Sequence, residues 1–582
     1  MVNFDGHLHF AQGQCRGVCV QASVNKTTRS HSDRFELLVL ALIALAGLFL
    51  RWWRLDLISF RYDTAETLIR ARESIHSGTF PLTGIVNSLG FRNPPGLLWA
   101  ILPPLLFSPS PAMATGWFGL LCLSGLWPLY RISQNWIGRW AFLLPCVLFA
   151  LLPSSVAGGR SIWAQCLLPA LGSWMLYWLV TARSEERELK TRVIGAIAAF
   201  TIALGATSTH LASVLYVVVV VMLAASGFRR VGRKAILNAV RARTVLGFFL
   251  TACFMALSLV PSLADWMHHR RSAPQAKPEH IRKFESLMPA PDPWYVRVKS
   301  GLSGQLDPFL TAPLTLGFDE EPERSHTELR AKMVAPVDFA CVIAAILGIA
   351  LCAAAIAKKS GDAQSSDVLP MKSLVHKDLP VVLLMWLVLP PTAGALMADR
   401  INPTYFALGT PALMLSTGIA VHGIMGRWKS RVVQALGALF LAAAAGVYIT
   451  FHVSFLKDVD RSRFLNSEYY IPLANQLATA KTMAEHGVDT KRFYHLSGAW
   501  YQRPYDYLLT EMTETHVAPE AQQWALAEDL NLRKKQPERA NEIQSRAQTW
   551  EGKVGMIFFS DPKEWRAYMD RYYNLPVQPG EL

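Results

Sequence analysis

Two acidic residues that could take part in chemistry follow the first long apolar run of the chain. Asp63 comes soon after that run and Glu66 comes three residues later, so a helix would present both carboxylates on one face. Ionisable side chains this close to lipid cost free energy and therefore indicate a function, such as accepting a proton from a substrate. The alternative is structural, because aspartate favours the position before a helix, although a capping Asp63 could still face a cleft.

Cationic and aromatic side chains gather at the ends of later apolar runs. The candidates are Arg160, His210, Arg400 and Tyr405. Arginine offers a forked set of hydrogen-bond donors that suits a phosphate group. Each candidate also has a structural alternative: Arg400 could reach lipid headgroups, Arg160 could pair with an acid, and His210 could simply start the next helix. Together with Asp63, these residues predict a reaction at one membrane face rather than a buried ion path.

The composition is that of a polytopic membrane protein. Hydrophobic residues make up 52% of the 582 residues and charged residues only 17%, which is too apolar for an ordinary soluble chain. The net charge of +14 does not predict a nucleic-acid partner, because the basic residues lie mainly in short loops between apolar runs. The eight cysteines predict neither a disulfide framework nor a zinc site, since most of them lie in apolar runs.

The elements that must position these side chains are about eleven predicted transmembrane helices. They cover residues 35–53, 112–130, 140–153, 164–182, 193–207, 211–227, 245–262, 337–357, 379–398, 404–425 and 432–453. Residues 97–107 are also apolar, but Pro103 and Pro104 interrupt them and they are too short to cross a membrane, so we expect a re-entrant or interfacial helix. Residues 1–34 are polar and show no core of a cleavable signal peptide, which predicts a cytoplasmic amino-terminal tail.

The basic loops set the orientation of the predicted spans. Lysines and arginines concentrate in every second loop, and this bias would be lost if residues 97–107 crossed the membrane. The transmembrane domain, residues 35–453, therefore places two large loops outside, residues 54–111 and 263–336. Residues 454–582 predict a small soluble α/β domain on the same side. Its predicted strands are 492–496 and 554–560, and its predicted helices are 467–486, 519–548 and 562–573.

Four stretches of the sequence resemble a family of integral-membrane enzymes. They are Asp63–Gly78 with the pattern D-x-x-E-x6-E-x4-G, Asn93–Trp99, Arg160–Pro169 and Tyr405–Leu415. Between residues 35 and 451 the chain is similar to the GT-C glycosyltransferase superfamily, and in particular to its protein mannosyltransferase-like and aminoarabinose transferase-like branches. The resemblance implies an α-helical polytopic membrane fold with periplasmic juxtamembrane helices and a carboxy-terminal soluble domain.

The resemblance also implies an activity and a partner. The superfamily moves a sugar from a polyprenyl-phosphate carrier to an acceptor, here at the periplasmic face of a bacterial inner membrane. Asp63 matches the family's first-loop acid and would act as a base or orient the acceptor, with Glu66 beside it. The candidates for binding the departing lipid phosphate are Arg400, then Arg160, then His210, with Tyr405 near the first. A lipid, a glycan and a protein all stay open as the acceptor.

One departure from the family concerns a metal. Several branches carry a second acid between the third and fourth spans that helps to hold a divalent cation, whereas residues 154–163 of this chain contain Arg160 and no acid. Arg160 could supply the positive charge itself, and Mg²⁺ or Mn²⁺ stays open as a cofactor. Two other functions stay open. A secondary transporter or flippase would need ionisable residues in mid-span, where this chain has almost none. A non-catalytic scaffold would need no catalytic acid at all.

Overall fold

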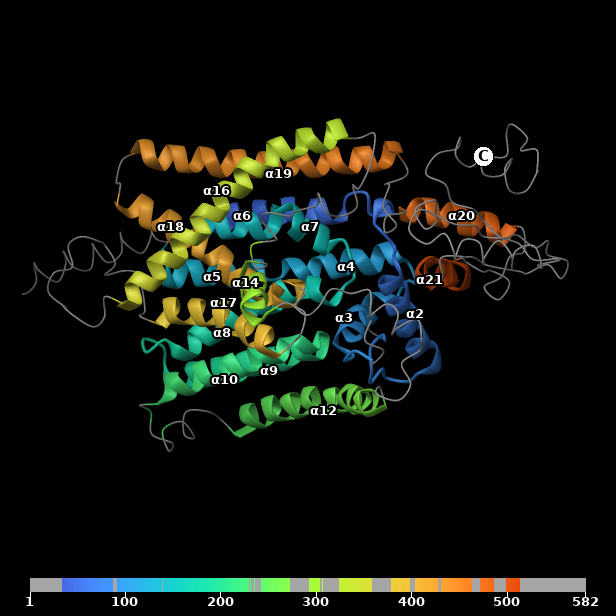
Figure 1. The fold of residues 1–582 in the computed structure, drawn as a ribbon, viewed down its shortest axis with the longest axis horizontal. Helices are drawn as coiled ribbons and strands as arrows, with labels where there is room; N and C mark the ends of the chain where they lie inside the picture. Colours follow the sequence, from blue (N-terminus) through green and yellow to red (C-terminus); the bar gives the residue numbers. More distant parts are fainter. Residues whose placement is uncertain are drawn as a thin grey trace, which may run out of the picture.

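The chain is helical in nearly all of the part that the structure describes (Figure 1). This computed structural model describes residues 34–86, 92–138, 140–229, 231, 235, 242–272, 293–303, 306, 324–357, 378–397, 403–427, 431–462, 472–485 and 499–512. Within these ranges the β-structure consists of two isolated bridges, Ser59 with Pro472 and Val86 with Arg92. Nearly all of the predicted amino-terminal tail lies outside the described residues.

Between residues 62 and 228 the helices follow one another along the chain with mostly short connections, whereas most later helices are separated by stretches outside the described residues. The elements used below are η1 (Leu55–Leu57), α2 (Tyr62–Ser77), α3 (Gly96–Leu105), α4 (Pro111–Leu123), α5 (Leu126–Trp136), α6 (Leu143–Leu151), α7 (Pro153–Gly159), α8 (Ala164–Arg183), α9 (Leu189–Thr209), η2 (Leu211–Ser213), α10 (Val214–Phe228), α12 (Ala242–Ser272), α14 (Trp294–Ser303), α16 (Arg324–Ala357), α17 (Asp378–Met397), η6 (Pro403–Gly409), α18 (Thr410–Arg427), α19 (Arg431–Ser462), α20 (Leu473–Glu485), α21 (Ala499–Tyr507) and η7 (Leu508–Met512).

Nine helices in the described part of the chain are long and apolar enough to cross a membrane. They cover Arg34–Trp52, Pro111–Trp136, Leu189–Thr209, Leu211–Phe228, Leu246–Asp265, Val334–Ala357, Asp378–Leu396, Phe406–Met425 and Val432–Lys457. The predicted multi-pass, α-helical membrane fold is thus confirmed, whereas the predicted count of eleven spans is not. The segment predicted to be re-entrant forms α3, a helix of 10 residues that is too short to cross.

Two predicted spans, residues 140–153 and 164–182, are not among these nine helices. The first is divided into α6 and α7, because the backbone leaves the helical conformation at Leu152 and Pro153 begins a new helix. The second coincides with α8, which is 20 residues long but carries Gln165, Ser173 and Thr181. α8 is not among the nine helices counted as spans.

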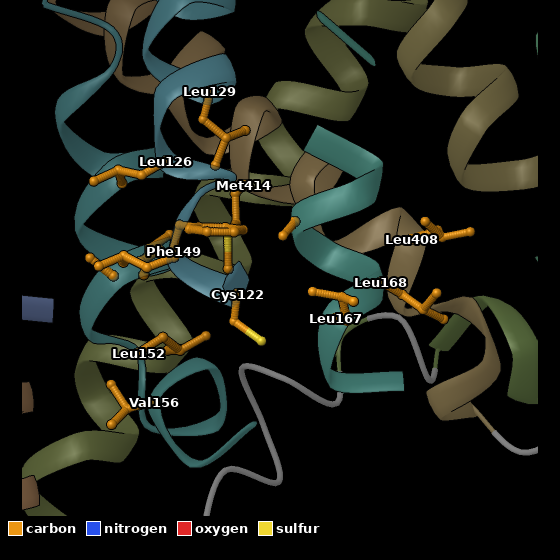
Figure 2. Packing of buried hydrophobic residues seen from close by; sticks show 14 of the residues in the cluster. Cys122, Leu126, Leu129, Phe149, Leu152, Val156, Leu167, Leu168, Leu408 and Met414 are labelled. Atoms are coloured by element: carbon orange, nitrogen blue, oxygen red, sulfur yellow. The ribbon is translucent and has the colours of Figure 1, made fainter. Parts of the chain in front are cut away.

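The core of the bundle lies where α4, α5, α6, α8 and α18 meet. Figure 2 shows part of it, with Cys122 from α4, Leu126 from α5, Phe149 from α6, Leu168 from α8 and Met414 from α18. A Cβ atom at Gly125 would lie 2.6 Å from the Phe149 ring and 2.8 Å from the Ala170 backbone, so these helices approach closely only because this residue is glycine. Lipid tails are as apolar as these side chains, so close packing stabilises the bundle.

Helix α2 lies in the first large loop and is held by one buried face. Thr64, Ala65, Leu68 and Ala71 lie on that face with helical spacing. The helix ends before Gly78, whose φ of 65° is left-handed and suits glycine. α2 packs against α3 on one side and against α21 on another, so it lies between the bundle and the carboxy-terminal part of the chain (Figure 1).

The predicted carboxy-terminal α/β domain is described only in part. α20 lies inside the predicted helix 467–486, and α21 with η7 lies in a stretch for which no helix was predicted. Both predicted strands and the other two predicted helices lie outside the described residues. The α/β class of this domain therefore stays a prediction.

A buried polar contact joins α16 to α19. The Tyr448 hydroxyl donates a hydrogen bond of 2.8 Å to Asp338 Oδ1, and both side chains are buried. Asp338 is a carboxylate near the start of a span, where an unpaired polar group is costly. The contact therefore fixes how α19 lies on α16.

Replacing Tyr448 by phenylalanine is expected to lower the free energy of unfolding by about 0.5–1.5 kcal/mol, because the Asp338 carboxylate loses its donor. Thermal unfolding of the purified protein in detergent measures the change. Tyr216→Phe is a matched control, because the Tyr216 hydroxyl makes only a 3.4 Å hydrogen bond to the Phe406 carbonyl. An equal loss of stability in both variants would contradict a special role for the α16–α19 contact.

Candidate functional site

The first turn of α2 holds the predicted catalytic acid, Asp63. The backbone of Arg61 is extended and the helix starts at Tyr62, so Asp63 lies in the first turn. Its side chain is partly buried, and no hydrogen bond or ion pair to its carboxylate is found within the described part of the chain. Burial raises the pKa of Asp63 above its ordinary value of 3.8, and the nearby Arg61 charge opposes this shift. A carboxylate of this kind is suited to taking up a proton.

The raised pKa of Asp63 predicts the pH dependence of any reaction in which it is the base. The carboxyl group must be ionised to accept a proton, so the rate is full above its pKa and falls as the pH drops through it. We expect the acidic limb of the pH–rate profile to lie at a higher pH than it would for an exposed aspartate. Arg61→Gln removes the charge that lowers the pKa of Asp63, so it should move the limb to still higher pH. A limb unchanged in Arg61→Gln would contradict this assignment.

Glu66 is buried and its carboxylate is shared between two arginines. Oε1 lies 3.2 Å from Nε of Arg70 on the next turn of α2, and Oε2 lies 3.1 Å from Nε of Arg503 in α21. The second contact is an ion pair rather than a well-aligned hydrogen bond, since Oε2 has no partner by hydrogen-bond geometry. Because both oxygens face a guanidinium, Glu66 is suited to positioning its neighbours rather than to taking up a proton.

Arg160 is buried at the carboxy-terminal end of the first transmembrane helix. Its guanidinium donates hydrogen bonds of 2.6–3.3 Å to the carbonyl oxygens of Leu50, Arg51, Trp53 and Arg54. The last carbonyls of a helix have no partner within the helix, and a cation there also interacts favourably with the helix dipole. These contacts favour a structural role for Arg160, and its predicted role in binding phosphate is untested.

Gly159 makes room for a second buried arginine, Arg51. Arg51 donates hydrogen bonds to carbonyl oxygens of the first helix, of α6 and of α7. A Cβ atom at Gly159 would lie 2.5 Å from Arg51 Nε, whereas a Cβ atom at Gly158 would meet only Cys166, at an ordinary 3.5 Å. The packing of the two arginines thus explains the glycine at 159 and the arginine at 160, whereas no close contact requires glycine at 158.

Gly159→Ala should therefore lower the free energy of unfolding by about 1–3 kcal/mol, because Arg51 must move away from its carbonyl partners. Gly158→Ala is the matched control on the same short helix and should be close to neutral. Thermal unfolding and the yield of folded protein in detergent compare the two. The packing account fails if Gly158→Ala is the more destabilising substitution.

His210 links α9 to η2 and carries no charge at neutral pH. Burial lowers the pKa of His210 to about 4. Its Nε2 atom lies 3.3 Å from Gln165 Nε2 at the start of α8. A neutral imidazole can donate a hydrogen bond to a phosphate oxygen, but it does not supply the positive charge that the sequence predicted for it.

The predicted residues that the structure describes lie on elements that contact one another at one end of the bundle. The Thr64 hydroxyl, next to Asp63, lies 3.4 Å from the Ile162 carbonyl, and Gln165 reaches His210 from the same connection between α7 and α8. η2 contacts η6, which contains Tyr405, although the side chain of Tyr405 lies outside the described residues. Arg400 also lies outside them. The structure thus connects Asp63 to His210 through neighbouring elements and leaves the place of Arg400 open.

An arginine near this end of the bundle was not among the candidates predicted from the sequence. Arg297 lies on α14, which packs against α17 and η6, and its side chain is partly buried. Trp294 and Tyr295 at the start of α14 are exposed, as is typical of an interfacial helix. The sequence showed these aromatic residues, but it did not show that α14 would pack beside η6.

Within the described part of the chain, the side chains around Asp63 do not offer a set of ligands that fits a divalent cation. The described residues contain no group of three or more His, Cys, Asp or Glu side chains that could hold a metal ion. The nearest connection, between α7 and α8, carries Arg160 in place of an acid. A divalent cation prefers several oxygen ligands. The predicted choice between Mg²⁺, Mn²⁺ and no metal is untested.

Comparison with known proteins gives structural matches only. No protein-family model and no curated protein matches the sequence. ArnT from Cupriavidus metallidurans matches in the apo state with 16% identity over 82% of this chain and 74% of ArnT, at a TM-score of 0.40. The same protein bound to undecaprenyl phosphate matches at a TM-score of 0.39, with 16% identity over 82% of this chain and 75% of ArnT.

A third match is the oligosaccharyltransferase AglB from Archaeoglobus fulgidus, in complex with an inhibitory peptide and a dolichol-phosphate. The identity is 13%, the match covers 78% of this chain and 58% of AglB, and the TM-score is 0.41. ArnT and AglB are GT-C glycosyltransferases, the superfamily that the sequence motifs resemble.

Proposed function

We propose that this chain is a membrane glycosyltransferase that moves a sugar from a polyprenyl-phosphate donor to an acceptor at the outer face of the membrane. The observation that supports this most directly is Asp63, a partly buried carboxylate with a raised pKa, on a helix that follows the first span. The basic loops favour the periplasmic side of a bacterial inner membrane for this reaction. The sugar could be a hexose or a pentose.

In the proposed reaction the acceptor is a hydroxyl group of a lipid, a glycan or a protein. Its oxygen attacks the anomeric carbon of the donor while the bond between that carbon and the phosphate oxygen breaks. Asp63 takes the hydroxyl proton as the new glycosidic bond forms, and the polyprenyl phosphate leaves with the electron pair of the broken bond. The sugar is inverted at its anomeric carbon.

The departing phosphate needs positive charge beside it, because negative charge grows on its oxygens as the bond breaks. Arg400 remains our first proposal for this cation, with Tyr405 as a neighbouring hydrogen-bond donor. His210 would contribute a hydrogen bond from a neutral ring, and Arg160 would keep the end of the first helix in place. Glu66 would hold the turn that carries Asp63.

Release of the lipid carrier tests this proposal without knowledge of the sugar. The purified protein is placed in liposomes with a lipid extract that contains polyprenyl-phosphate sugars, and undecaprenyl phosphate is measured by mass spectrometry. The proposal predicts release that depends on the protein, together with a new glycoside among the acceptor lipids, glycans or proteins. A protein that moves such lipids between leaflets of the liposomes without releasing undecaprenyl phosphate would be a transporter instead.

A further inference from the structure

The first turn of α2, which carries Asp63, is not held by a helix cap. Arg61 occupies the position before the helix, and its side chain makes no capping hydrogen bond. The first backbone N–H groups of a helix have no partner within the helix, so an uncapped first turn frays more easily. Asp63 therefore depends on side-chain contacts from outside α2 for a fixed position.

Arg503 of α21 contacts the residues on both sides of Asp63. Its Nε atom lies 3.1 Å from Glu66 Oε2, and its guanidinium hydrogen-bonds to the Tyr62 hydroxyl. Asp506, one turn further along α21, lies 3.5 Å from Arg503 Nη1 and helps to orient the guanidinium. A single arginine from the carboxy-terminal part of the chain thus spans the turn that carries Asp63.

The contact with Glu66 is costly to break because Glu66 is buried. A buried carboxylate needs nearby positive charge, and removal of one partner leaves it undercompensated. Arg70 is the other partner, but it comes from α2 itself and so cannot fix α2 relative to the rest of the molecule. Arg503 is the partner that does so.

Other contacts attach the same carboxy-terminal part at places away from Asp63. We call residues 472–485 and 499–512 the docked segment. Glu511 lies 2.8 Å from Nε of Arg72, two turns beyond Asp63, and Gln476 donates a 3.0 Å hydrogen bond to the Phe60 carbonyl. The Tyr507 hydroxyl donates to the Pro109 carbonyl. Docking of the segment can therefore be weakened without touching the residues that flank Asp63.

We propose that Arg503 is a positioning residue for Asp63, so that the catalytic site is complete only when the docked segment lies on α2. Arg503 acts through Glu66 and Tyr62 and does not itself contact the reacting atoms. The docked segment is then part of the catalytic unit as well as part of the carboxy-terminal domain. This inference rests on the function proposed above.

Arg503→Ala in the full-length protein tests the inference. At saturating donor lipid extract we expect kcat for undecaprenyl phosphate release to fall by about 10- to 100-fold with little change in KM, because a misplaced Asp63 slows the chemical step rather than donor binding. Arg503→Lys keeps the charge near Glu66 but cannot span both partners, so it should recover part of the loss. Rates are compared per amount of folded protein, as judged by thermal unfolding.

Arg72→Ala is the matched control, because it removes the ion pair with Glu511 that holds the same segment on the same helix, together with a hydrogen bond to the Leu105 carbonyl in α3. It should lower the unfolding temperature and leave kcat close to that of the wild type. If Arg72→Ala loses as much kcat as Arg503→Ala, docking alone matters and the positioning role is refuted. Wild-type kcat in Arg503→Ala refutes it as well.

A double-mutant comparison supplies a second readout. If Arg503 acts through Glu66, the variant carrying both Glu66→Gln and Arg503→Ala should lose no more kcat than the more impaired single variant. If the fold losses in kcat of the two single variants multiply in the double variant, Arg503 does not act through Glu66. Asp63→Asn separates the two proposals: if it stays active, the proposed function fails, and if it is inactive while Arg503→Ala is fully active, only the present inference fails.

Discussion

Asp63→Asn is expected to lower the rate of undecaprenyl phosphate release by about 10²- to 10⁴-fold, the usual contribution of a general base. Asparagine has nearly the same shape as aspartate but cannot take up the acceptor proton. The protein should still fold, because no hydrogen bond or ion pair of the Asp63 carboxylate is found among the described residues. Mass spectrometry of the released lipid phosphate gives the rate, and thermal unfolding gives the stability.

Glu73→Gln provides the control for Asp63→Asn. Glu73 lies on the same helix, and its exposed carboxylate makes only a loose contact of 3.9 Å with Arg70. This substitution exchanges a carboxylate for an amide in the same way and should leave transfer close to the wild-type rate. Activity of Asp63→Asn equal to that of Glu73→Gln would remove Asp63 from the mechanism.

The second prediction with a large effect distinguishes the roles of Arg400 and Arg160, the two arginines predicted from the sequence to bind the phosphate. Arg400→Ala is expected to lower transfer by about 10- to 100-fold with little change in stability, because one charge-assisted contact to the departing phosphate is lost. Arg160→Ala should instead lower the free energy of unfolding by at least about 3 kcal/mol, because several carbonyl oxygens at the end of the first helix lose their donor. Transfer rates and unfolding temperatures of both variants are measured side by side.

The opposite pattern would reassign the two residues. If Arg160→Ala folds as stably as the wild type and loses transfer, the observed contacts with the carbonyl oxygens are not its main role. If Arg400→Ala transfers normally, another cationic side chain must bind the departing phosphate. Arg297 on α14, which contacts η6, is then the next residue to replace.

The spans could be predicted from the sequence because their signal is local. Long apolar runs gave nine helices close to their predicted places, and Pro103 with Pro104 indicated that residues 97–107 would not cross. The break between α6 and α7 was missed, although Pro153 lies at it. A proline at the start of a helix and one at the end of a span look alike in a sequence.

The partners of the site residues could not be predicted, because they come from distant parts of the chain. Glu66 and Arg503 are separated by more than four hundred residues, and nothing local to either one indicates the other. The contacts of Arg160 with the end of the first helix span 106 to 110 residues of sequence. The type and place of Asp63 in the sequence make it a candidate, but the sequence could not show which arginines contact carboxylates and which contact backbone.

The most direct test of the central claim is the side of the membrane on which residue 63 lies. Asp63→Cys is introduced into a chain whose native cysteines are replaced by serine, and intact spheroplasts are treated with a membrane-impermeant maleimide. The account predicts labelling from outside, reduced by added undecaprenyl phosphate. Labelling that occurs only after the membrane is opened would place residue 63 in the cytoplasm and contradict the account.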